Sequence, residues 1–341
     1  MSLRRFPALP ILLLAILFPA LLAAGCSSLG PVAGRSATGE SASPHGKMQI
    51  PEEFEVALSL RPGQSWKSRF LSTSEVRRKL TGPDGKESVR NRTVGLEIVA
   101  TQSVTEMSGG VARIEVRESS VRILQEGNYI EAPFRQFGPP DTVTFTVDTA
   151  TGEADFSGME KAYRDWMPAV MRSPVGDVMG KSFRVESFVA QLKQLYGKPF
   201  TRHAGRKYAK GTRFTIDKDF LLPFLGPSAS LGPVPVEIRT WFEGFRVKNG
   251  DHVLSLKGEY EGERVWTDDD LAGRLADFQS PFPASFRSSG AIRGRFESEV
   301  DVLSGREIRS TNRLEYASSA TFGGATLTEE ISGKSTMEPA D

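Results

Sequence analysis

Few side chains in this chain are of the types that carry out catalysis or hold a metal ion. The 341 residues include three histidines, His45, His203 and His252, and a single cysteine, Cys26. No histidine stands at ligand spacing from another histidine or a carboxylate, so we expect no metal site. The same shortage disfavours a Ser–His–Asp arrangement, and no Gly-x-Ser-x-Gly turn occurs. The sequence therefore predicts no catalytic residue and no cofactor, in a protein that is not an enzyme.

Aspartates offer two further candidates for chemistry. Residues 268–270 are three aspartates in a row, a composition that suits calcium. Consecutive side chains point in different directions, so we favour the start of a short helix that Thr267 caps. Asp148 and Asp301 could be imagined as a catalytic pair. Each precedes a Ser/Thr-Gly pair, and a turn in which the carboxylate accepts backbone hydrogen bonds explains both.

The one cysteine lies at the end of an apolar leader. Arg4 and Arg5 precede an apolar stretch over residues 6–24, and small residues lead up to Cys26 in the run Leu22-Ala23-Ala24-Gly25-Cys26. A cationic start, an apolar middle and a small-residue end are typical of a secretory signal. The run resembles the lipobox of bacterial lipoproteins. The resemblance implies cleavage before Cys26, a diacylglycerol on its sulfur and a further acyl chain, such as palmitate, on the new amino terminus.

Two alternatives to a lipoprotein signal at residues 1–25 remain open. An uncleaved membrane helix needs about 20 apolar residues, but Pro7, Pro10 and Pro19 would each remove a helix hydrogen bond. Ordinary secretion would leave Cys26 as an unpaired thiol in an oxidising compartment. We favour lipid attachment at Cys26. By resemblance to Gram-negative sorting rules, Ser27 in place of aspartate implies the outer membrane, and we expect a lipid-anchored protein that faces the periplasm.

Residues 26–51 are small and polar, with almost no large apolar side chains. Such a composition cannot bury enough surface to offset ordering entropy, so it predicts a flexible tether. Lys and Arg number 43 and Asp and Glu 42, for a net charge of +1. A nearly neutral chain has no general electrostatic attraction for nucleic acid, so we expect none as a partner.

Beyond the tether, apolar residues alternate with polar ones at a period of two. Val143, Phe145 and Val147 would face one side of a strand, with threonines on the other. A second such strand is expected near 111–116. Turn motifs separate the expected strands, at Gly82-Pro83-Asp84-Gly85, Ser108-Gly109-Gly110, Lys248-Asn249-Gly250-Asp251 and Ser304-Gly305. The sequence therefore predicts a mainly β (α+β) protein built from antiparallel sheets.

Helical spacing occurs in the middle of the chain. One apolar stripe comprises Met159, Tyr163, Trp166 and Val170, and a second comprises Val185, Phe188, Val189 and Leu192. Pro168 predicts that the first helix is short or kinked. The run from Arg202 to Arg213 is rich in Lys and Arg. It could touch anionic headgroups, but we favour a solvated linker face, and the same holds for Arg77-Arg78-Lys79.

The chain shows signs of an internal duplication. Three landmarks recur in order: a glycine before an aromatic strand at Gly63 and Gly211, a long hairpin, and the Asp-x-x-[Ser/Thr]-Gly turns at Asp148 and Asp301. We predict two related β units, 52–157 and 208–337, with a helical insert and basic linker at 158–207. The landmarks resemble those of uncharacterised bacterial lipoproteins with a duplicated β domain, a family that implies no activity.

A more distant likeness is to lipoprotein carriers of the LolA and LolB type. That likeness implies a curved antiparallel sheet wrapped around helices over an apolar cavity, and says little about function. Apolar residues at 220–225 precede a Gly/Pro/Ser-rich segment up to 233, which could form the lip of a pocket or, as we favour, a loop that plugs the core. We expect a non-enzymatic binder or carrier of an apolar ligand or lipid. The alternative is a structural or assembly factor that binds other envelope proteins.

Overall fold

A computed structural model describes residues 53–125, 127–132, 140–172, 185–209, 213–220, 234–248, 251–267, 286–322 and 324–340. These residues form a mainly β structure with antiparallel strands, which confirms the predicted fold class. The elements are β1 (Glu53–Val56), β2 (Ser65–Thr81), β3 (Glu87–Ser108), β4 (Val111–Gln125), β5 (Asn128–Glu131), β6 (Val143–Asp148), β7 (Ala154–Asp155), α2 (Ser157–Met171), α4 (Val185–Thr201), β8 (Arg206–Ala209), β9 (Arg213–Phe220), β10 (Val234–Lys248), β11 (Asp251–Trp266), β12 (Phe286–Asp301), β13 (Glu307–Phe322) and β14 (Ala325–Pro339).

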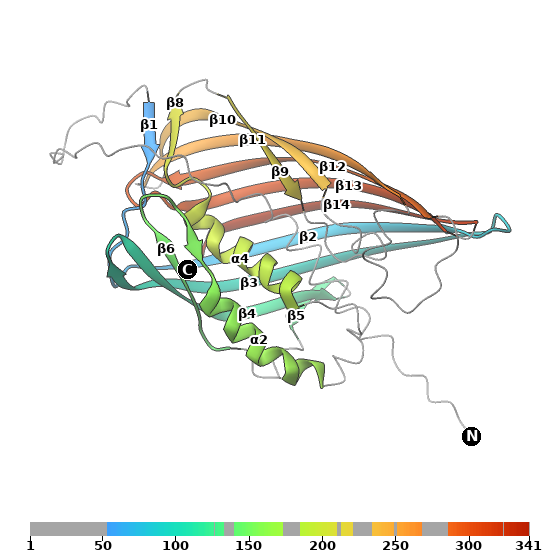
Figure 1. The fold of residues 1–341 in the computed structure, drawn as a ribbon, viewed down its shortest axis with the longest axis horizontal. Coiled ribbons are helices and arrows are strands. Elements are labelled where there is room, and N and C mark those ends of the chain that lie inside the picture. The colour runs from blue at the N-terminus through green and yellow to red at the C-terminus, as the bar shows by residue number, and fades with distance from the viewer. Residues whose placement is uncertain are drawn as a thin grey trace.

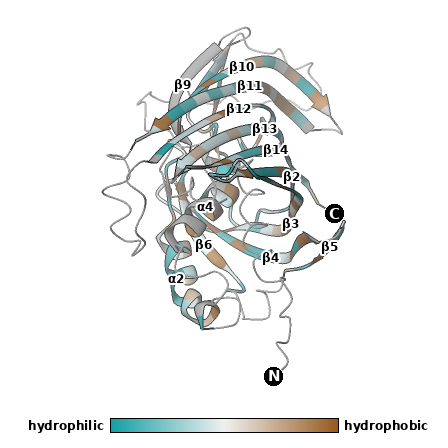
Figure 2. Ribbon diagram, turned by 90° about the vertical axis from the view of Figure 1, so that its right-hand side faces the viewer, coloured by the Kyte–Doolittle hydropathy of each residue, from teal (hydrophilic) through white to brown (hydrophobic). Residues whose placement is uncertain are grey.

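One large sheet dominates the structure. Its order is β7-β6-β4-β3-β2-β14-β13-β12-β11-β10-β9, with β5 also paired to β4, and every pairing is antiparallel. The long strands run side by side across the molecule in Figure 1. Seen after a quarter turn in Figure 2, the sheet follows an arc from β9 and β10 round to β4 and β5, with α4 and α2 on its concave side. A separate two-stranded sheet pairs β1 with β8.

The sheet has an apolar inner face, which we define as the face toward α2 and α4, and a polar outer face. In β6, Val143, Phe145 and Val147 are buried and the residues between them are not, as predicted. Side chains from β2, β3, β4, β6 and β10–β14 form one continuous core cluster with both helices. The amide of Gln102, on the inner face of β3, donates to the Tyr196 carbonyl of α4 at 2.9 Å. Burial between sheet and helices is therefore the main stabilising contact.

The helices bury the stripes that their spacing predicts. Met159, Tyr163 and Val170 of α2 are buried, Trp166 is half-buried against the same core, and Val189 and Leu192 of α4 are buried. Of the two expectations for the first helix, short or kinked, the first is wrong, because α2 has 15 residues and continues past Pro168 to Met171. A proline in the last turn interrupts little that follows it. The side chains of Val185 and Phe188, and the helix predicted after Thr267, lie outside the described residues.

Turns join the strands where the sequence places them. Residues 82–86 link β2 to β3, Gly109 and Gly110 link β3 to β4, and β10 meets β11 at the pair Lys248 and Asp251. Gly109 and Gly110 have φ angles of 57° and 83°, a region that favours glycine.

The two Asp-x-x-[Ser/Thr]-Gly turns have the same hydrogen bonds. Asp148 Oδ1 accepts from the backbone N–H groups of Ala150 and Thr151 at 2.9 and 2.8 Å. Asp301 likewise accepts from Leu303 and Ser304, at 3.2 and 3.0 Å. The segment after β1 joins both turns, because Leu58 N–H donates to Thr149 O and Ser59 N–H to Ser304 O. The turn interpretation of both aspartates is confirmed.

The predicted β units, 52–157 and 208–337, share the large sheet. Their strands meet where β2 pairs with β14, from Ser68 opposite Pro339 to Thr81 opposite Thr326. Each unit contributes a run of neighbouring strands in chain order, β2 to β7 and β9 to β14. The sheet is thus continuous across both predicted units, and the duplication itself stays a prediction.

Candidate functional site

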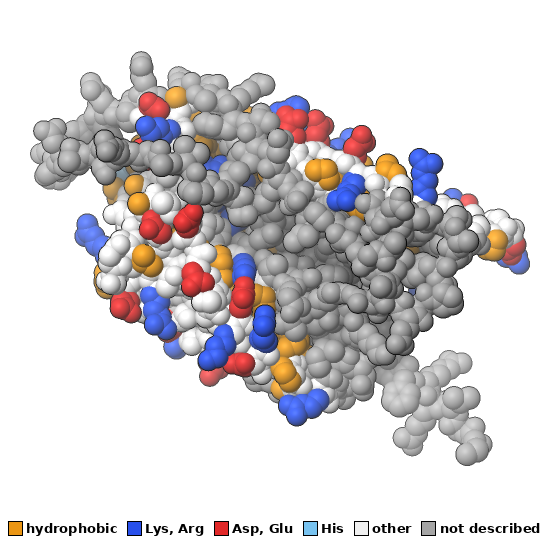
Figure 3. Space-filling view, viewed as in Figure 1, with side chains coloured by type: hydrophobic (Ala, Val, Ile, Leu, Met, Phe, Trp, Pro, Cys, Tyr) orange, Lys and Arg blue, Asp and Glu red, His pale blue; other side chains and the backbone are white. Residues whose placement is uncertain are grey.

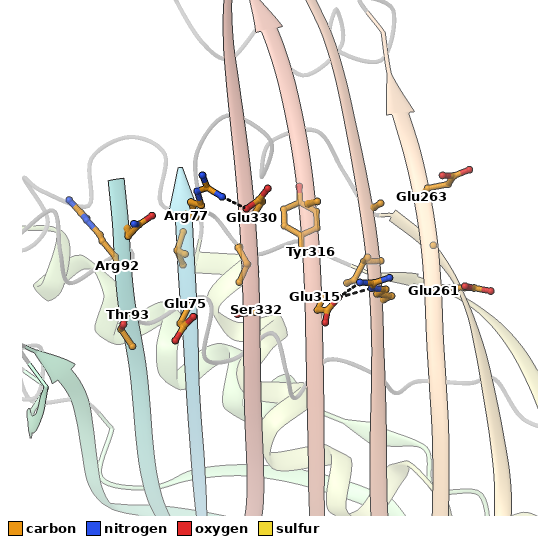
Figure 4. Close-up of a pocket in the computed structure, with 18 residues that line it drawn as sticks. Glu75, Arg77, Arg92, Thr93, Glu261, Glu263, Glu315, Tyr316, Glu330 and Ser332 are labelled. Carbon is orange, nitrogen blue, oxygen red and sulfur yellow. Dashed lines mark hydrogen bonds and ion pairs between the residues drawn. The ribbon is translucent and has the colours of Figure 1, made fainter. Parts of the chain in front are cut away.

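A hollow lies on the inner face near the middle of the sheet. One row of directly opposed residues crosses its floor on six neighbouring strands, in the order Arg92, Val76, Ile331, Tyr316, Ile292 and Gly262. We call this set the floor row, and Figure 4 shows the strands that carry it. All six residues line a hollow of about 1150 Å³. That volume is sufficient for a large organic ligand.

The floor of the hollow is mostly apolar, whereas its flanks belong to the other face. Val76, Ile331, Tyr316 and Ile292 are each buried. Their neighbours along the strands point to the outer face, because side chains alternate in a strand. On that face Arg77 pairs with Glu330 at 3.4 Å and Arg293 with Glu315 at 2.6 Å (Figure 4). The inner face of the sheet, which borders the hollow, is therefore suited to contact with the apolar part of a ligand.

Glycines shape the inner face beside the hollow. Gly294 of β12 stands opposite Tyr260 of β11, and Gly258 of β11 stands opposite Phe296 of β12. A Cβ atom at Gly294 or Gly258 would lie 2.2 Å from a ring carbon of its opposite partner. The rings thus cover the backbone of the glycines, in close cross-strand contact that no other residue type permits.

The next inner-face row toward the β2–β3 hairpin is charged. It begins with Arg90 of β3, Arg78 of β2 and Glu329 of β14, which stand opposite one another in that order. The Arg78 guanidinium donates to the Glu329 carboxylate, whose side chain is only 3% exposed. Burial raises the pKa of Glu329, and the charge of Arg78 opposes that rise. An apolar surface and a charged row are therefore adjacent on one face.

A second cluster of titratable groups lies at the end of α4. Glu307 of β13 is fully buried, and three groups from the α4 end surround its carboxylate. Lys198 Nζ lies 3.6 Å, Arg202 Nη1 3.5 Å and His203 Nε2 3.4 Å from its oxygens. Burial by itself would raise the pKa of Glu307. The charges of Lys198 and Arg202 and the hydrogen bond from His203 outweigh it, so the pKa falls below its ordinary value.

His203 is the only member of this cluster with a neutral side chain. Burial lowers its pKa from 6.5 to about 4, and the nearby Arg202 adds to the effect. A neutral ring fits the geometry, because Nε2–H can donate toward Glu307 and Ser298 while Nδ1 accepts from the Tyr208 hydroxyl at 2.8 Å. No residue of the cluster is more than 8% exposed. We infer that this cluster holds α4 against β12 and β13.

This burial corrects the interpretation of the run from Arg202 to Arg213 as a solvated linker face for Arg202 and His203, whereas Lys207 is exposed as that interpretation expects. Arg202 and His203 are 5% and 3% exposed, and the Arg202 guanidinium stacks 4.1 Å from the centre of the Phe296 ring. The interpretation is also wrong for Arg78, which faces inward to Glu329. Arg77 and Lys79 do lie toward solvent and pair with glutamates. In both cases the buried acid that attracts the cation is remote in sequence.

The other candidate residues that the structure describes do not come together in one site. His252 is half-buried at the start of β11, and Asp148 and Asp301 serve their turns. Cys26, His45, the aspartates at 268–270 and the segment 221–233 lie outside the described residues. Among the residues that the structure describes, no group of histidine, cysteine, aspartate or glutamate could hold a metal ion. Within the same residues, no helix has the length and apolar character needed to cross a membrane.

Sequence reasoning missed the floor row altogether. The period-two pattern shows which residues of a strand share a face, but not which strands are neighbours. Val76 and Ile331 are opposite each other although the chain between them contains most of the fold. The only local signal was the set of glycines within strands, since a glycine in a strand often marks a close approach.

Comparison with known proteins gives little guidance. No protein-family model matches the chain, and no curated protein matches it. Among solved structures, it is similar to a BenF-like porin from Pseudomonas fluorescens Pf-5, with 9% identity, 81% of this chain and 99% of that chain covered, and a TM-score of 0.25. OccK2 (OpdF) of Pseudomonas aeruginosa also has 9% identity, with 81% and 98% covered and a TM-score of 0.21. Similarity at these TM-scores supports no conclusion about function.

Proposed function

We propose that this chain is a non-enzymatic lipoprotein that binds or carries an apolar ligand in the hollow above the floor row. The single observation that carries the proposal is a hollow of about 1150 Å³ whose floor is made of Val76, Ile331, Tyr316 and Ile292. Ligand sites are concave and mostly apolar, with polar groups at their edge, and this hollow has an apolar floor flanked by charged residues. Its described lining contains no histidine and no cysteine.

The anchor in this proposal is Cys26. The leader at 1–25 and the polar segment 26–51 support lipid attachment at its sulfur and a flexible tether to the folded part. A single acyl chain binds a membrane only marginally, whereas several acyl chains on one residue anchor a protein stably. The proposed location is the outer membrane, with the folded part on the periplasmic side. Intact-mass measurement tests lipid attachment: a bare thiol at Cys26, or an uncleaved leader, would contradict the proposed location.

Binding in the hollow can be tested with the chain from Ser27 onward. We expect native mass spectrometry of the purified chain to show a bound lipid that organic solvent extracts. The variant Ile292→Trp, which fills the hollow, should lose this lipid. Ser289→Trp places the same side chain on the outer face of the same strand, outside the lining of the hollow, and should keep it. Thermal unfolding of both variants checks that they remain folded.

The alternative function is a structural or assembly factor. The charges on the described part of the face in Figure 3 are of both signs and interspersed, so no patch of one sign marks a partner surface there. A wild-type chain that carries no lipid, together with a stoichiometric cross-link to one envelope protein, would favour assembly over carriage.

A further inference from the structure

Three of the four described inner-face cations in the floor row and the charged row gather at one end, and the fourth, Arg264, lies at the other end against the Trp266 ring. Arg92 is the first residue of the floor row, and Arg90 and Arg78 stand next to it in the charged row beyond. All three share the inner face, because they are two residues apart along β3 or directly opposite on β2. Glu329 is the one acid in the described part of these two rows. The described residues therefore place three positive charges and one negative charge around this end of the hollow.

The single acid, Glu329, is already paired with a cation. Glu329 is almost completely buried and accepts a hydrogen bond from Arg78. Within the described residues, Arg90 and Arg92 have no ion pair or hydrogen bond with a side chain. Arg90 is exposed, Arg92 is half-buried, and Arg90 stands directly opposite Arg78. Like charges opposite each other in a sheet are unfavourable, so an anion placed here would relieve a repulsion.

The excess of positive charge is local. On the outer face, several arginines are matched by glutamates, as in Arg77 with Glu330 and Arg293 with Glu315, whereas Arg295 and Arg313 stand opposite each other without an ion pair to a described residue. The whole chain has a net charge of only +1. Arg90 and Arg92 thus do not reflect a generally basic protein. They lie where an apolar surface ends and the sheet approaches water.

We propose that the ligand of the hollow is an anionic amphiphile with one carboxylate or phosphate head. The head binds Arg90 and Arg92, and the apolar part lies over Ile331, Tyr316 and Ile292. Across the floor row, five strand spacings from β3 to β11 span roughly 24 Å, which suits a long acyl chain. A guanidinium fork matches a carboxylate or phosphate in geometry, and its hydrogen bonds to an anion are charge-assisted. This inference rests on the proposed function.

The test uses the full chain in isolated membranes at about pH 8, where a fatty acid is ionised. The probes are a long-chain fatty acid with a diazirine on its chain and the matching fatty alcohol, which has no charge. After illumination, mass spectrometry quantifies labelling of peptides from β12, β13 and β14. We expect the acid to label these strands about 10-fold more than the alcohol, the effect of one charge-assisted hydrogen bond.

The double variant Arg90→Gln/Arg92→Gln should bring this ratio close to one while labelling by the alcohol stays the same. The matched control Arg295→Gln/Arg313→Gln removes two exposed, directly opposed arginines from the outer face of β12 and β13, outside the lining of the hollow, and should keep the preference. A diazirine phospholipid with the same chain forms a third arm: stronger labelling by it than by the fatty acid assigns the head to a phosphate.

The outcomes separate the two proposals. Equal labelling by acid and alcohol, or a preference that survives in the double variant, overturns the anionic head and leaves apolar binding in place. Absence of labelling by every probe overturns the apolar site, and the anionic head with it. A loss of labelling by the alcohol in the double variant would show that the two arginines support the fold rather than the head.

Discussion

Replacing His203 by glutamine should remove a large part of the acid sensitivity of this fold. His203 is 3% exposed, and burial lowers its pKa from 6.5 to about 4. The folded protein therefore keeps the ring neutral in a pH range where the unfolded chain binds a proton. Because the unfolded state binds more protons there, the free energy of unfolding falls as pH is lowered from about 6.5 to about 4. Above pH 6.5 the contribution is fully present.

The size of the effect follows from the pKa difference. One pKa unit corresponds to about 1.4 kcal/mol, so the shift of His203 accounts for a loss of about 3 kcal/mol by pH 4. Glutamine at position 203 can still donate toward Ser298 and Glu307 but does not titrate. Its free energy of unfolding should be lower than that of the wild type at neutral pH, and should change less on acidification.

Urea unfolding at a series of pH values from 4 to 8, followed by tryptophan fluorescence, measures this difference. The difference between the wild type and His203→Gln should shrink by about 3 kcal/mol from pH 7.5 to pH 4. His252→Gln is the matched control, because His252 is half-buried on β11 and outside the Glu307 cluster. Parallel pH profiles for the wild type and His203→Gln would refute the burial of a neutral imidazole at this site.

Three further substitutions test the packing. Glu307→Gln leaves two buried cations without their carboxylate and should cost about 3–5 kcal/mol in urea unfolding, whereas Glu315→Gln on the outer face should change stability little. Gly294→Ala puts a Cβ against the Tyr260 ring and should lower the free energy of unfolding by about 1–3 kcal/mol; an unchanged value would mean that the ring is not packed there. The buried hydroxyl of Ser72 has no hydrogen-bond partner among the described residues, so Ser72→Ala should raise stability by about 1 kcal/mol, and a lower denaturation midpoint would contradict that assignment.

Local patterns in the sequence predict the strands and turns well because they depend on near neighbours. Alternation places Val143, Phe145 and Val147 on one face whatever lies opposite, and Gly109 and Gly110 permit a tight turn that few other residues allow. The apolar stripes of both helices follow from the same logic. That α2 is not short despite Pro168 has a local reason too, since a proline near the last residues of a helix disturbs little.

The sites could not be predicted in this way. A basic run such as Arg202 and His203 is compatible with a solvated face until a buried acid is placed beside it, and Glu307 is remote in sequence. The same holds for Arg78 and Glu329. A favourable charge contact depends on distance and burial, and neither quantity is encoded in composition or spacing.

The sequence by itself determined the β-rich class, the faces of individual strands, the positions of the turns and an apolar leader that ends at Cys26. Only the tertiary structure decided that β2 pairs with β14, which brings Val76, Ile331 and Tyr316 into one row. The physical reason is that alternation is satisfied within each strand, whereas the choice of neighbour and register depends on burying many inner faces at once around α2 and α4.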